Sequence, residues 1–328
     1  MKININLDKI QIIKKQIRIG DFMDAAKYIW MNGKFVNWDD AKIHVLSHTI
    51  HYGNGVIEGT KAYKTEKGYA IFRLNEHTAR LKESAKMTLI DIPYTEEEMN
   101  QAQIELIRKN EFTGDNVYIR PFAFLGYGVM GVYHKEAPVE TVMSAWEWGA
   151  YLGEEGLRKG IKLKIASMTR PANTSSMGKA KATANYLNSQ MAKFEAIDCG
   201  YDEALLLDDQ GYVAEASGAC FFMIKNGELI TPPNDNSLAS ITQKMVIEMA
   251  EDFGMKVSRR RITREEVYVA DEAFLTGTAA EITPVAQVDA REIGTGSRGE
   301  ITEKIQSTYF DIVFGRNAKY EHYLTYID

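Results

Sequence analysis

Cysteine is scarce in this chain of 328 residues, which contains only Cys199 and Cys220. Two isolated thiols exclude a disulfide framework and a cysteine-rich metal site, and they fit a reducing compartment. Long apolar runs are also missing: the longest, residues 118–132, is interrupted by an arginine, a proline and several glycines. A membrane-spanning helix needs about 18 apolar residues. The first 20 residues lack the apolar core of a secretory signal. We therefore expect a cytoplasmic protein without a membrane span.

Positive charge is in deficit, with 39 Lys and Arg against 45 Asp and Glu, which gives a net charge of −6. An acidic chain is a poor candidate for binding the phosphate backbone of nucleic acids. Apolar residues make up 45% and charged residues 26% of the chain, as in ordinary globular proteins. At roughly 150 residues per domain, the length predicts about two domains. These features predict a soluble two-domain enzyme acting on small molecules.

Changes in composition along the chain predict its domain organisation. Residues 1–22 are rich in Ile, Lys and Asn; we interpret them as a dispensable N-terminal extension, with Met23 as a candidate native start. Residues 23–148 mix strands and helices and predict a small α+β domain. Residues 149–160 are polar and glycine-rich, as is typical of a linker. Residues 161–328 have frequent turns and few long crossovers, so we expect a larger, barrel-like α+β domain.

Three local patterns predict secondary structure. Asn32-Gly33, between alternating apolar residues, predicts a tight β-hairpin. Asn75 stands before a stretch with one apolar face and is the expected N-cap of a helix. Thr95 and Glu98 have the spacing of a capping box at the start of a second helix.

Two candidate catalytic residues stand out by their surroundings. Lys181 is flanked by alanines and a threonine, at the start of a helix expected from about Ala182. A lysine in a water-poor pocket can lose its proton and form a Schiff base, although a solvated lysine is the commoner explanation of this spacing. Glu215 lies between apolar segments and is either a turn residue or a buried acid paired with a cation.

Other segments are candidate anion sites. Ser240 and Thr242 lie at a helix start, where free N–H groups attract anions, although most such starts are simply capped. The turn at residues 276–279 offers a second set of N–H groups, as ordinary tight turns do. Two arginines complete the candidates: Arg80 on the first-domain helix, and Arg120 inside an apolar strand, where a structural ion pair is an equally good explanation.

Other chemistries lack support in the sequence. His44, His48 and His51 fall close together, but no HExxH or His/Cys pattern accompanies them, and alternation along a strand explains the first two. We therefore expect no metal site. A GxSxG elbow and a phosphate-binding GxxxxGK loop are absent, and we expect no GxGxxG sequence that follows a strand and opens a helix with a later acid, as a dinucleotide-binding turn does.

Taken together, seven segments resemble those of the branched-chain amino-acid aminotransferases, the fold-type IV group of pyridoxal-phosphate enzymes. Each segment is weak alone, but their joint order and spacing cover about residues 28–314. The segments are YIWMNGKFVNWDDAKIHVLSHTIHYGNGVIEG, VYIRPFAFLGYGVMGV, WEWGAYLG, KATANYLNS, GYVAEASG, SITQK and LTGTAAEITPV. The resemblance implies the two-domain fold-type IV arrangement, a small α/β domain beside a larger pseudo-barrel domain.

The resemblance also implies pyridoxal 5′-phosphate as the cofactor. Lys181 would hold it as an internal aldimine, Tyr186 would bind its phenolic oxygen, and Glu215 would pair with its pyridine nitrogen, which keeps the ring able to absorb electrons. The freed amine would act as acid and base. Lys179 is a second lysine nearby, so spacing alone assigns the role to Lys181. The implied cofactor-binding residues are Arg80, Lys181, Tyr186, Glu215, Ile241, Thr242 and Thr278.

The implied reaction moves the amino group of L-leucine, L-isoleucine or L-valine to 2-oxoglutarate, giving a branched-chain 2-oxo acid and L-glutamate. Tyr118 and Arg120 would lie on the substrate-carboxylate side, and the N–H groups of Thr278 and Ala279 would meet the α-carboxylate. The apolar pocket, part of which would come from a second subunit, is implied to contain Tyr52, Ile57, Val132, Trp148 and Tyr151.

The resemblance implies a homodimer at least, up to a hexamer. Ile57 stands where many relatives carry phenylalanine, and Tyr127-Gly128 also departs from the family pattern, so fine specificity is open. Two alternatives stay: another fold-type IV enzyme (a D-amino-acid aminotransferase or aminodeoxychorismate lyase), or a non-catalytic paralogue that serves as a binding scaffold.

Overall fold

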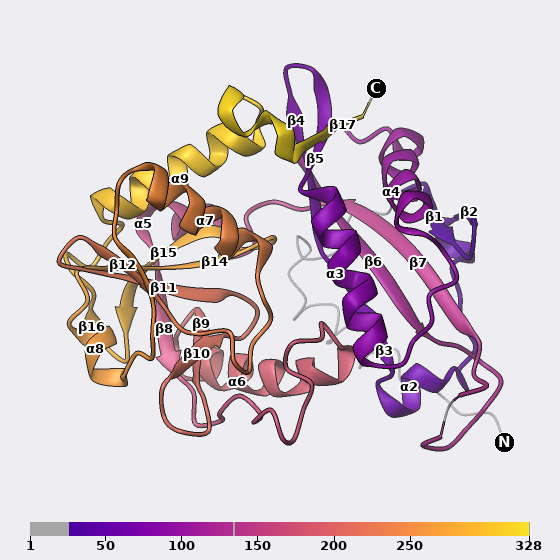
Figure 1. Cartoon of the computed structure of the whole chain (residues 1–328), viewed down its shortest axis with the longest axis horizontal. Coiled ribbons are helices and arrows are strands. Elements are labelled where there is room, and N and C mark those ends of the chain that lie inside the picture. Colours follow the sequence, from indigo (N-terminus) through magenta and orange to yellow (C-terminus); the bar gives the residue numbers. More distant parts are fainter. Residues whose placement is uncertain (1–25, 134, 328) are drawn as a thin grey trace, which may run out of the picture.

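The computed structural model describes residues 26–133 and 135–327. Two β-sheets lie side by side, and helix α3 (Leu74–Met87) stands at their junction (Figure 1). The predicted extension, residues 1–22, lies outside the described residues. No helix within the described ranges is long and apolar enough to cross a membrane.

The first sheet is antiparallel and, apart from the C-terminal strand β17, belongs to the N-terminal half. Its hairpin at Asn32-Gly33 is confirmed, since Met31 pairs with Lys34 across the turn. Its longest strands, β6 and β7, pair from Val117 with Glu147 to Leu125 with Val139. The strands, in spatial order, are β17 (Leu324–Tyr326), β5 (Gly68–Phe72), β4 (Thr60–Thr65), β6 (Asn116–Leu125), β7 (Val139–Glu147), β1 (Tyr28–Met31) and β2 (Lys34–Asn37), with β3 (Gly55–Ile57) beside β6.

The second sheet is mixed and curls into a half-barrel, which confirms the predicted α+β class. Its pairs are antiparallel except β8 with β9, β8 with β15 and β12 with β13. In spatial order the strands are β10 (Val213–Ala216), β9 (Glu203–Leu207), β8 (Ile161–Ile165), β15 (Glu281–Val288), β14 (Glu272–Gly277), β11 (Cys220–Lys225), β12 (Glu228–Thr231) and β13 (Val257–Arg259), with β16 (Arg291–Glu292) beside β15.

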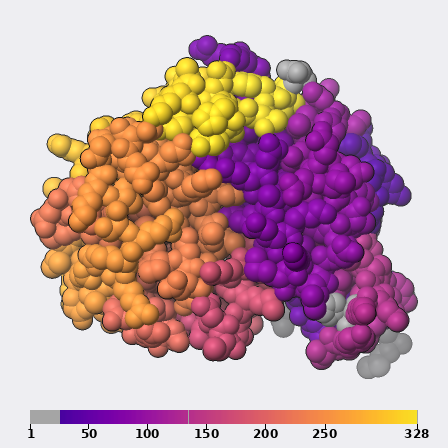
Figure 2. Space-filling view, in the orientation of Figure 1, coloured from indigo at the N-terminus to yellow at the C-terminus, as the bar shows by residue number. Residues whose placement is uncertain are grey.

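The chain crosses between the sheets twice. The first crossing is the predicted linker, which contains the short helix α5 (Glu154–Lys159). The second follows α9 (Glu300–Val313) and returns to the first sheet, where β17 pairs with β5. This last segment covers the junction in Figure 2. One buried cluster there joins Tyr63 and Phe72 of the first sheet to Phe222 and Tyr309 of the second half, so the two sheets share a core. The domain boundaries themselves stay a prediction.

The observed helix starts agree only in part with those predicted from the sequence. The capping box of Thr95 with Glu98 is confirmed at the start of α4. The predicted N-cap at Asn75 is wrong: α3 begins at Leu74, after Arg73, because the buried Arg73 side chain is held by Glu76 and Glu248. The helices and 3-10 turns not yet placed are α2 (His48–Tyr52), α4 (Glu96–Asn110), α6 (Tyr186–Asp198), α7 (Ile241–Asp252), α8 (Arg264–Tyr268), η1 (Trp38–Asp40), η2 (Thr183–Asn185) and η3 (Ala318–Tyr323).

Two further expectations are wrong. His48 does not lie on a strand but begins the helix α2, where its buried ring contacts the carbonyl of Gly131. The helix expected from about Ala182 begins later, at Tyr186, after the 3-10 turn η2. Ala182 instead pairs with Val56 of the first sheet, and this tertiary contact keeps the backbone extended at Lys181. A helix start would not have allowed that pairing.

Candidate active site

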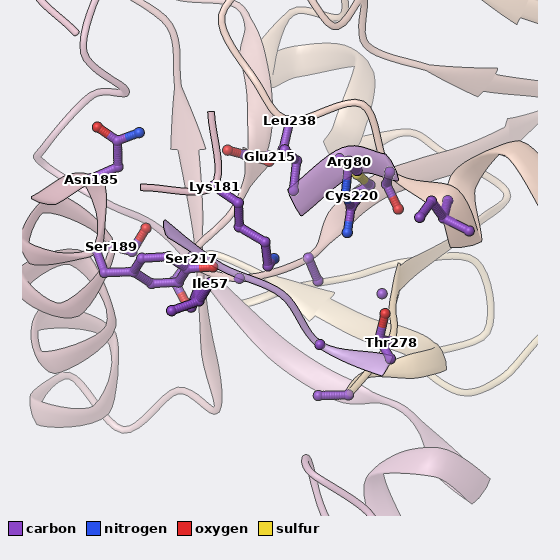
Figure 3. A pocket seen from close by; sticks show the side chains of 18 of the residues that line it. Ile57, Arg80, Lys181, Asn185, Ser189, Glu215, Ser217, Cys220, Leu238 and Thr278 are labelled. Carbon is purple, nitrogen blue, oxygen red and sulfur yellow. The ribbon is translucent and has the colours of Figure 1, made fainter. Parts of the chain in front are cut away.

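A cavity of about 580 Å³ lies where elements of both sheets meet. Its volume is in the range of small-molecule sites. Figure 3 shows the Lys181 side chain extending into it, with Glu215, Arg80 and Thr278 around it. The cavity brings together most of the predicted site residues. Those that line it are Ile57, Arg80, Tyr118, Arg120, Trp148, Tyr151, Lys181, Tyr186, Glu215, Ile241, Thr278 and Ala279.

The backbone of Lys181 is held by the first half of the chain. Its N–H donates to Ser84 Oγ of α3 over 3.1 Å, and its carbonyl accepts from the Ile57 N–H over 3.0 Å. Among the lysines of the described residues, Lys181 alone lines the cavity, whereas Lys179 is exposed. The backbone that carries the amine is therefore fixed by two contacts with the first half of the chain.

The surroundings of the Lys181 amine favour a cation. Burial alone lowers the pKa of the amine, but Tyr186 and the Glu58 carboxylate outweigh burial, so the pKa is raised. The amine lies 6.0 Å from the centre of the Tyr186 ring. A positively charged nitrogen in this cavity is thus stabilised by its acidic neighbours.

Glu215, on β10, is paired with an arginine that sequence reasoning missed. Arg170 Nε lies 3.0 Å from Glu215 Oε1, and both side chains are nearly buried. Burial raises the pKa of Glu215, while Arg170 and Lys181 oppose that rise. The sequence gives no signal for this pair, because Arg170 lies in a polar loop more than forty positions earlier.

The side chain of Arg80, a residue of α3, reaches the start of α7. Its guanidinium donates to the carbonyl of Ala239 over 2.9 Å, next to the N-cap Ser240. The N–H groups of Ile241 and Thr242 belong to the first turn of this 12-residue helix, which leaves them without partners inside the helix. An arginine and a helix N-terminus together form a site suited to a dianion.

A buried carboxylate, that of Glu58, binds the Arg80 guanidinium. Glu58 accepts from Arg80 Nε over 2.6 Å and from a second guanidinium nitrogen over 2.9 Å, and also from His77 Nδ1 over 2.8 Å. Burial raises the pKa of Glu58, but Arg80 and His77 outweigh it and hold the pKa far below its usual range. Sequence reasoning missed Glu58 and His77. An acid within the apolar run "GVIEGT" was the available signal, since such an acid needs a cation.

Aromatic residues form the opposite wall. Tyr118 contacts Trp148, with ring centres 5.0 Å apart, and Trp148 contacts Tyr151 at 5.3 Å. Arg120 is half-buried beside them and donates to the Tyr118 hydroxyl over 3.3 Å. In the part of the chain that the structure describes, the Arg120 guanidinium has the Tyr118 hydroxyl and no carboxylate as a partner, and its Nε is buried without a hydrogen-bond partner. Its charge is therefore available to an acidic ligand.

Three predicted residues do not line this cavity. Thr242 is buried in the first turn of α7. Tyr52 and Val132 are exposed, by 41% and 86%, and the Tyr52 hydroxyl accepts from the N–H of Gly131. These two side chains therefore lie on the surface of the chain that carries them.

Comparisons with known proteins agree on one family. Residues 55–288 match the family model described as amino-transferase class IV. The branched-chain-amino-acid aminotransferase of Pseudomonas aeruginosa is 47% identical over 304 residues, which cover 93% of this chain and 98% of that protein.

Two solved structures have a similar fold. The T.th. branched-chain amino acid aminotransferase, complexed with N-(5′-phosphopyridoxyl)-L-glutamate, superposes with a TM-score of 0.87 at 45% identity, covering 92% of this chain and 99% of that one. The Thermobaculum terrenum enzyme of the same name, in its PLP form, gives a TM-score of 0.87 at 36% identity, over 93% and 99% of the two chains.

Proposed function

The chain belongs to the branched-chain amino-acid aminotransferases of class IV, and on this basis we propose that it moves the amino group of L-leucine, L-isoleucine or L-valine to 2-oxoglutarate. The products are a branched-chain 2-oxo acid and L-glutamate. The observation that carries this proposal is one cavity that holds a half-buried lysine, a carboxylate and an arginine at a helix N-terminus. No single one of these features would suffice.

The residues present fit pyridoxal 5′-phosphate. Lys181 offers the amine, Tyr186 a phenol beside it, and Glu215 a carboxylate for a protonated ring nitrogen. Arg80 and the first turn of α7 suit the phosphate. Thr276 Oγ1 is buried in the cavity wall without a hydrogen-bond partner, so one polar group is left for a ligand. When bound, the cofactor supplies an electron sink for the substrate's Cα–H bond.

The protein's own residues would then handle protons and orientation. The Lys181 amine would act first as a base that takes the proton from the substrate's Cα and then as an acid that delivers a proton to C4′ of the cofactor. The hydrogen bonds of the Lys181 backbone to Ser84 and Ile57 hold the residue in place. The paired Arg170 opposes the rise in the Glu215 pKa that burial causes, and so favours the carboxylate form that would hold a protonated ring nitrogen.

The pocket has to accept an apolar side chain in one half-reaction and a carboxylate in the other. Ile57, Trp148 and Tyr151 provide the apolar surface. Arg120, which has no acidic partner within the described chain, would bind the distal carboxylate of glutamate and 2-oxoglutarate. When leucine is bound, the Tyr118 hydroxyl and the Trp146 and Tyr118 rings still contact the guanidinium.

We also propose that the active unit is a homodimer at least, with Tyr52 and Val132 contributing to the partner's pocket. Their exposure on their own chain supports this. Light scattering on the eluting peak of a size-exclusion column measures the oligomer. The two unpaired thiols fit a reducing cytoplasm as the place of action.

The decisive experiment is an amino-donor panel with 2-oxoglutarate as acceptor, read together with the visible spectrum of the purified protein. We expect turnover with L-Leu, L-Ile and L-Val. Turnover with D-amino acids, or lyase activity on aminodeoxychorismate, would favour the alternative fold-type IV enzymes. Protein without cofactor absorbance and without turnover would favour the non-catalytic scaffold.

A further inference from the structure

A strained residue ends the turn that forms one wall of the cavity. Strands β14 and β15 are joined by a hairpin in which Gly277 pairs with Glu281, leaving residues 278–280 as the loop. Glu281 has φ +52°, in the left-handed region. The position after a three-residue hairpin loop often takes this conformation, and glycine adopts it without steric cost. A glutamate here needs another reason.

The side chain of Glu281 supplies that reason. Its Oε1 lies 2.8 Å from Lys61 Nζ and accepts from the Tyr63 hydroxyl over 2.9 Å. Both side chains of the ion pair are almost fully buried, with 3% exposure for Lys61 and 6% for Glu281. Lys61 and Tyr63 are alternate residues of β4, so they point to the same face of the first sheet. The second sheet's turn is thus held by a strand of the first sheet.

The ion pair also links the two walls of the cavity. Lys61 pairs with Tyr118 in the register of β4 with β6, and Arg120 follows two residues later on β6. Thr278 and Ala279, in the turn before Glu281, line the cavity from the other side. Figure 3 shows Thr278 on its own side of the cavity, away from Ile57. The buried Lys61–Glu281 contact therefore ties the turn to the strand β4, which lies next to the strand that carries Tyr118 and Arg120.

Stability alone does not account for such a pair. Removing two charges from water is costly, and well-packed apolar residues often stabilise a core as much or more. Strained backbone conformations persist where the surrounding structure enforces them, and they cluster at functional sites. The Lys61–Glu281 ion pair is buried, its glutamate has a left-handed backbone conformation, and the turn that it holds lines the cavity. These three features together point to a functional role.

We propose that Lys61 and Glu281 are positioning residues for the substrate's α-carboxylate. By tying the turn at residues 277–281 to β4, they hold the Thr278 and Ala279 N–H groups at the distance that the carboxylate requires. This inference rests on the proposed function, because it takes the ligand of these N–H groups to be an α-carboxylate.

Three variants test it: Glu281→Gly, which relieves the backbone strain but removes the carboxylate; Glu281→Gln; and the double variant Lys61→Met/Glu281→Gln, which leaves no unpaired buried charge. The probe is 4-methylvalerate, a carboxylate with the leucine side-chain skeleton but no amine. Its dissociation constant is measured on the holoenzyme by calorimetry. We expect it to rise about tenfold or more, since small misplacements in a site cost up to about 100-fold. Cofactor content and spectrum should stay as in the wild type.

A matched control separates positioning from general loosening. Glu248→Gln breaks another ion pair between the two halves, Arg73 with Glu248, away from the turn. We expect the control to lower the melting temperature without changing the dissociation constant of 4-methylvalerate. Hydrogen exchange of the peptide that covers residues 277–281, measured without substrate, should be faster in the Glu281 variants and unchanged in the control.

Two outcomes overturn the inference in different ways. Wild-type affinity for 4-methylvalerate in the Glu281→Gly variant, with unchanged exchange at the turn, would show that the glutamate only fills the turn. A wild-type holoenzyme that binds no 4-methylvalerate and transaminates no branched-chain amino acid would instead overturn the proposed function, and the inference with it.

Discussion

Arg170 Nε lies 3.0 Å from Glu215 Oε1 in the wall of the cavity, and this pair favours the charged form of Glu215 against the effect of burial. Burial raises the pKa of Glu215, and Arg170 is the leading group that opposes the rise. An acid with a raised pKa in the folded state reduces stability at high pH, and the penalty disappears as the pH falls through that pKa.

We therefore expect Arg170→Gln to destabilise the fold at neutral pH by about 3 kcal/mol, the scale of a buried charge that has lost its partner. The loss should shrink as the pH is lowered toward 5, because Glu215 then takes up a proton. Calorimetric melting of wild type and variant between pH 5 and 8 measures this. Arg170→Lys, which keeps the charge, should lose less. A pH-independent difference would contradict the role assigned to Arg170.

Lys181 should be the lysine that holds the cofactor. Lys181→Ala is expected to lose the protein-bound cofactor absorbance and nearly all turnover, because the amine in the cavity is gone. Lys179→Ala is the matched control: its side chain is exposed, and both properties should persist. Visible spectra and Leu-dependent glutamate formation measure the two effects, and the reverse pattern would move the role to Lys179.

Arg120→Met should affect the two substrates unequally. Glutamate and 2-oxoglutarate lose a charge-assisted contact and are expected to lose roughly 2 kcal/mol or more of kcat/KM, while leucine loses much less. Single-turnover rates for each half-reaction, followed by the cofactor spectrum, measure both. Equal losses would place Arg120 at the α-carboxylate or give it a purely structural role.

Glu58→Gln should weaken both the fold and the anion site. The Glu58 pKa is held far below its usual range, chiefly by Arg80 and His77 against the effect of burial. An acid with a lowered pKa stabilises the fold above its unfolded pKa, and this contribution is lost as the pH falls. The variant should therefore be less stable by about 3 kcal/mol at pH 7, with a difference that narrows below about pH 4.5.

Urea unfolding at several pH values measures this difference. Glu66→Gln is the control: Glu66 is exposed in the turn between β4 and β5, and its substitution should have little effect on the free energy of unfolding. The Glu58 variant should also bind pyridoxal 5′-phosphate more weakly, because Arg80 loses the carboxylate that orients it. Unchanged cofactor affinity would show that Arg80 needs no such support.

Much of the protein was predictable from local sequence. The hairpin at Asn32-Gly33 and the capping box at Thr95 depend on a few adjacent residues, and both are confirmed. The α+β class followed from the alternation of strands and helices. The family followed from the order and spacing of several segments, and the structure gathers most of the residues implied by them in one cavity.

Tertiary contacts decided the rest. The start of α3 moved to Leu74 because Arg73 binds acids on two helices, and Lys181 stays extended because Ala182 pairs with Val56. The pairs Glu58 with Arg80 and Lys61 with Glu281 join residues that are 22 and 220 positions apart. The sequence by itself determined the class of the fold, the hairpin, the capping box and the family, because those depend on adjacent residues or on the order of segments along the chain. Which buried charge meets which partner depends on how two sheets pack, and only the tertiary structure determines that.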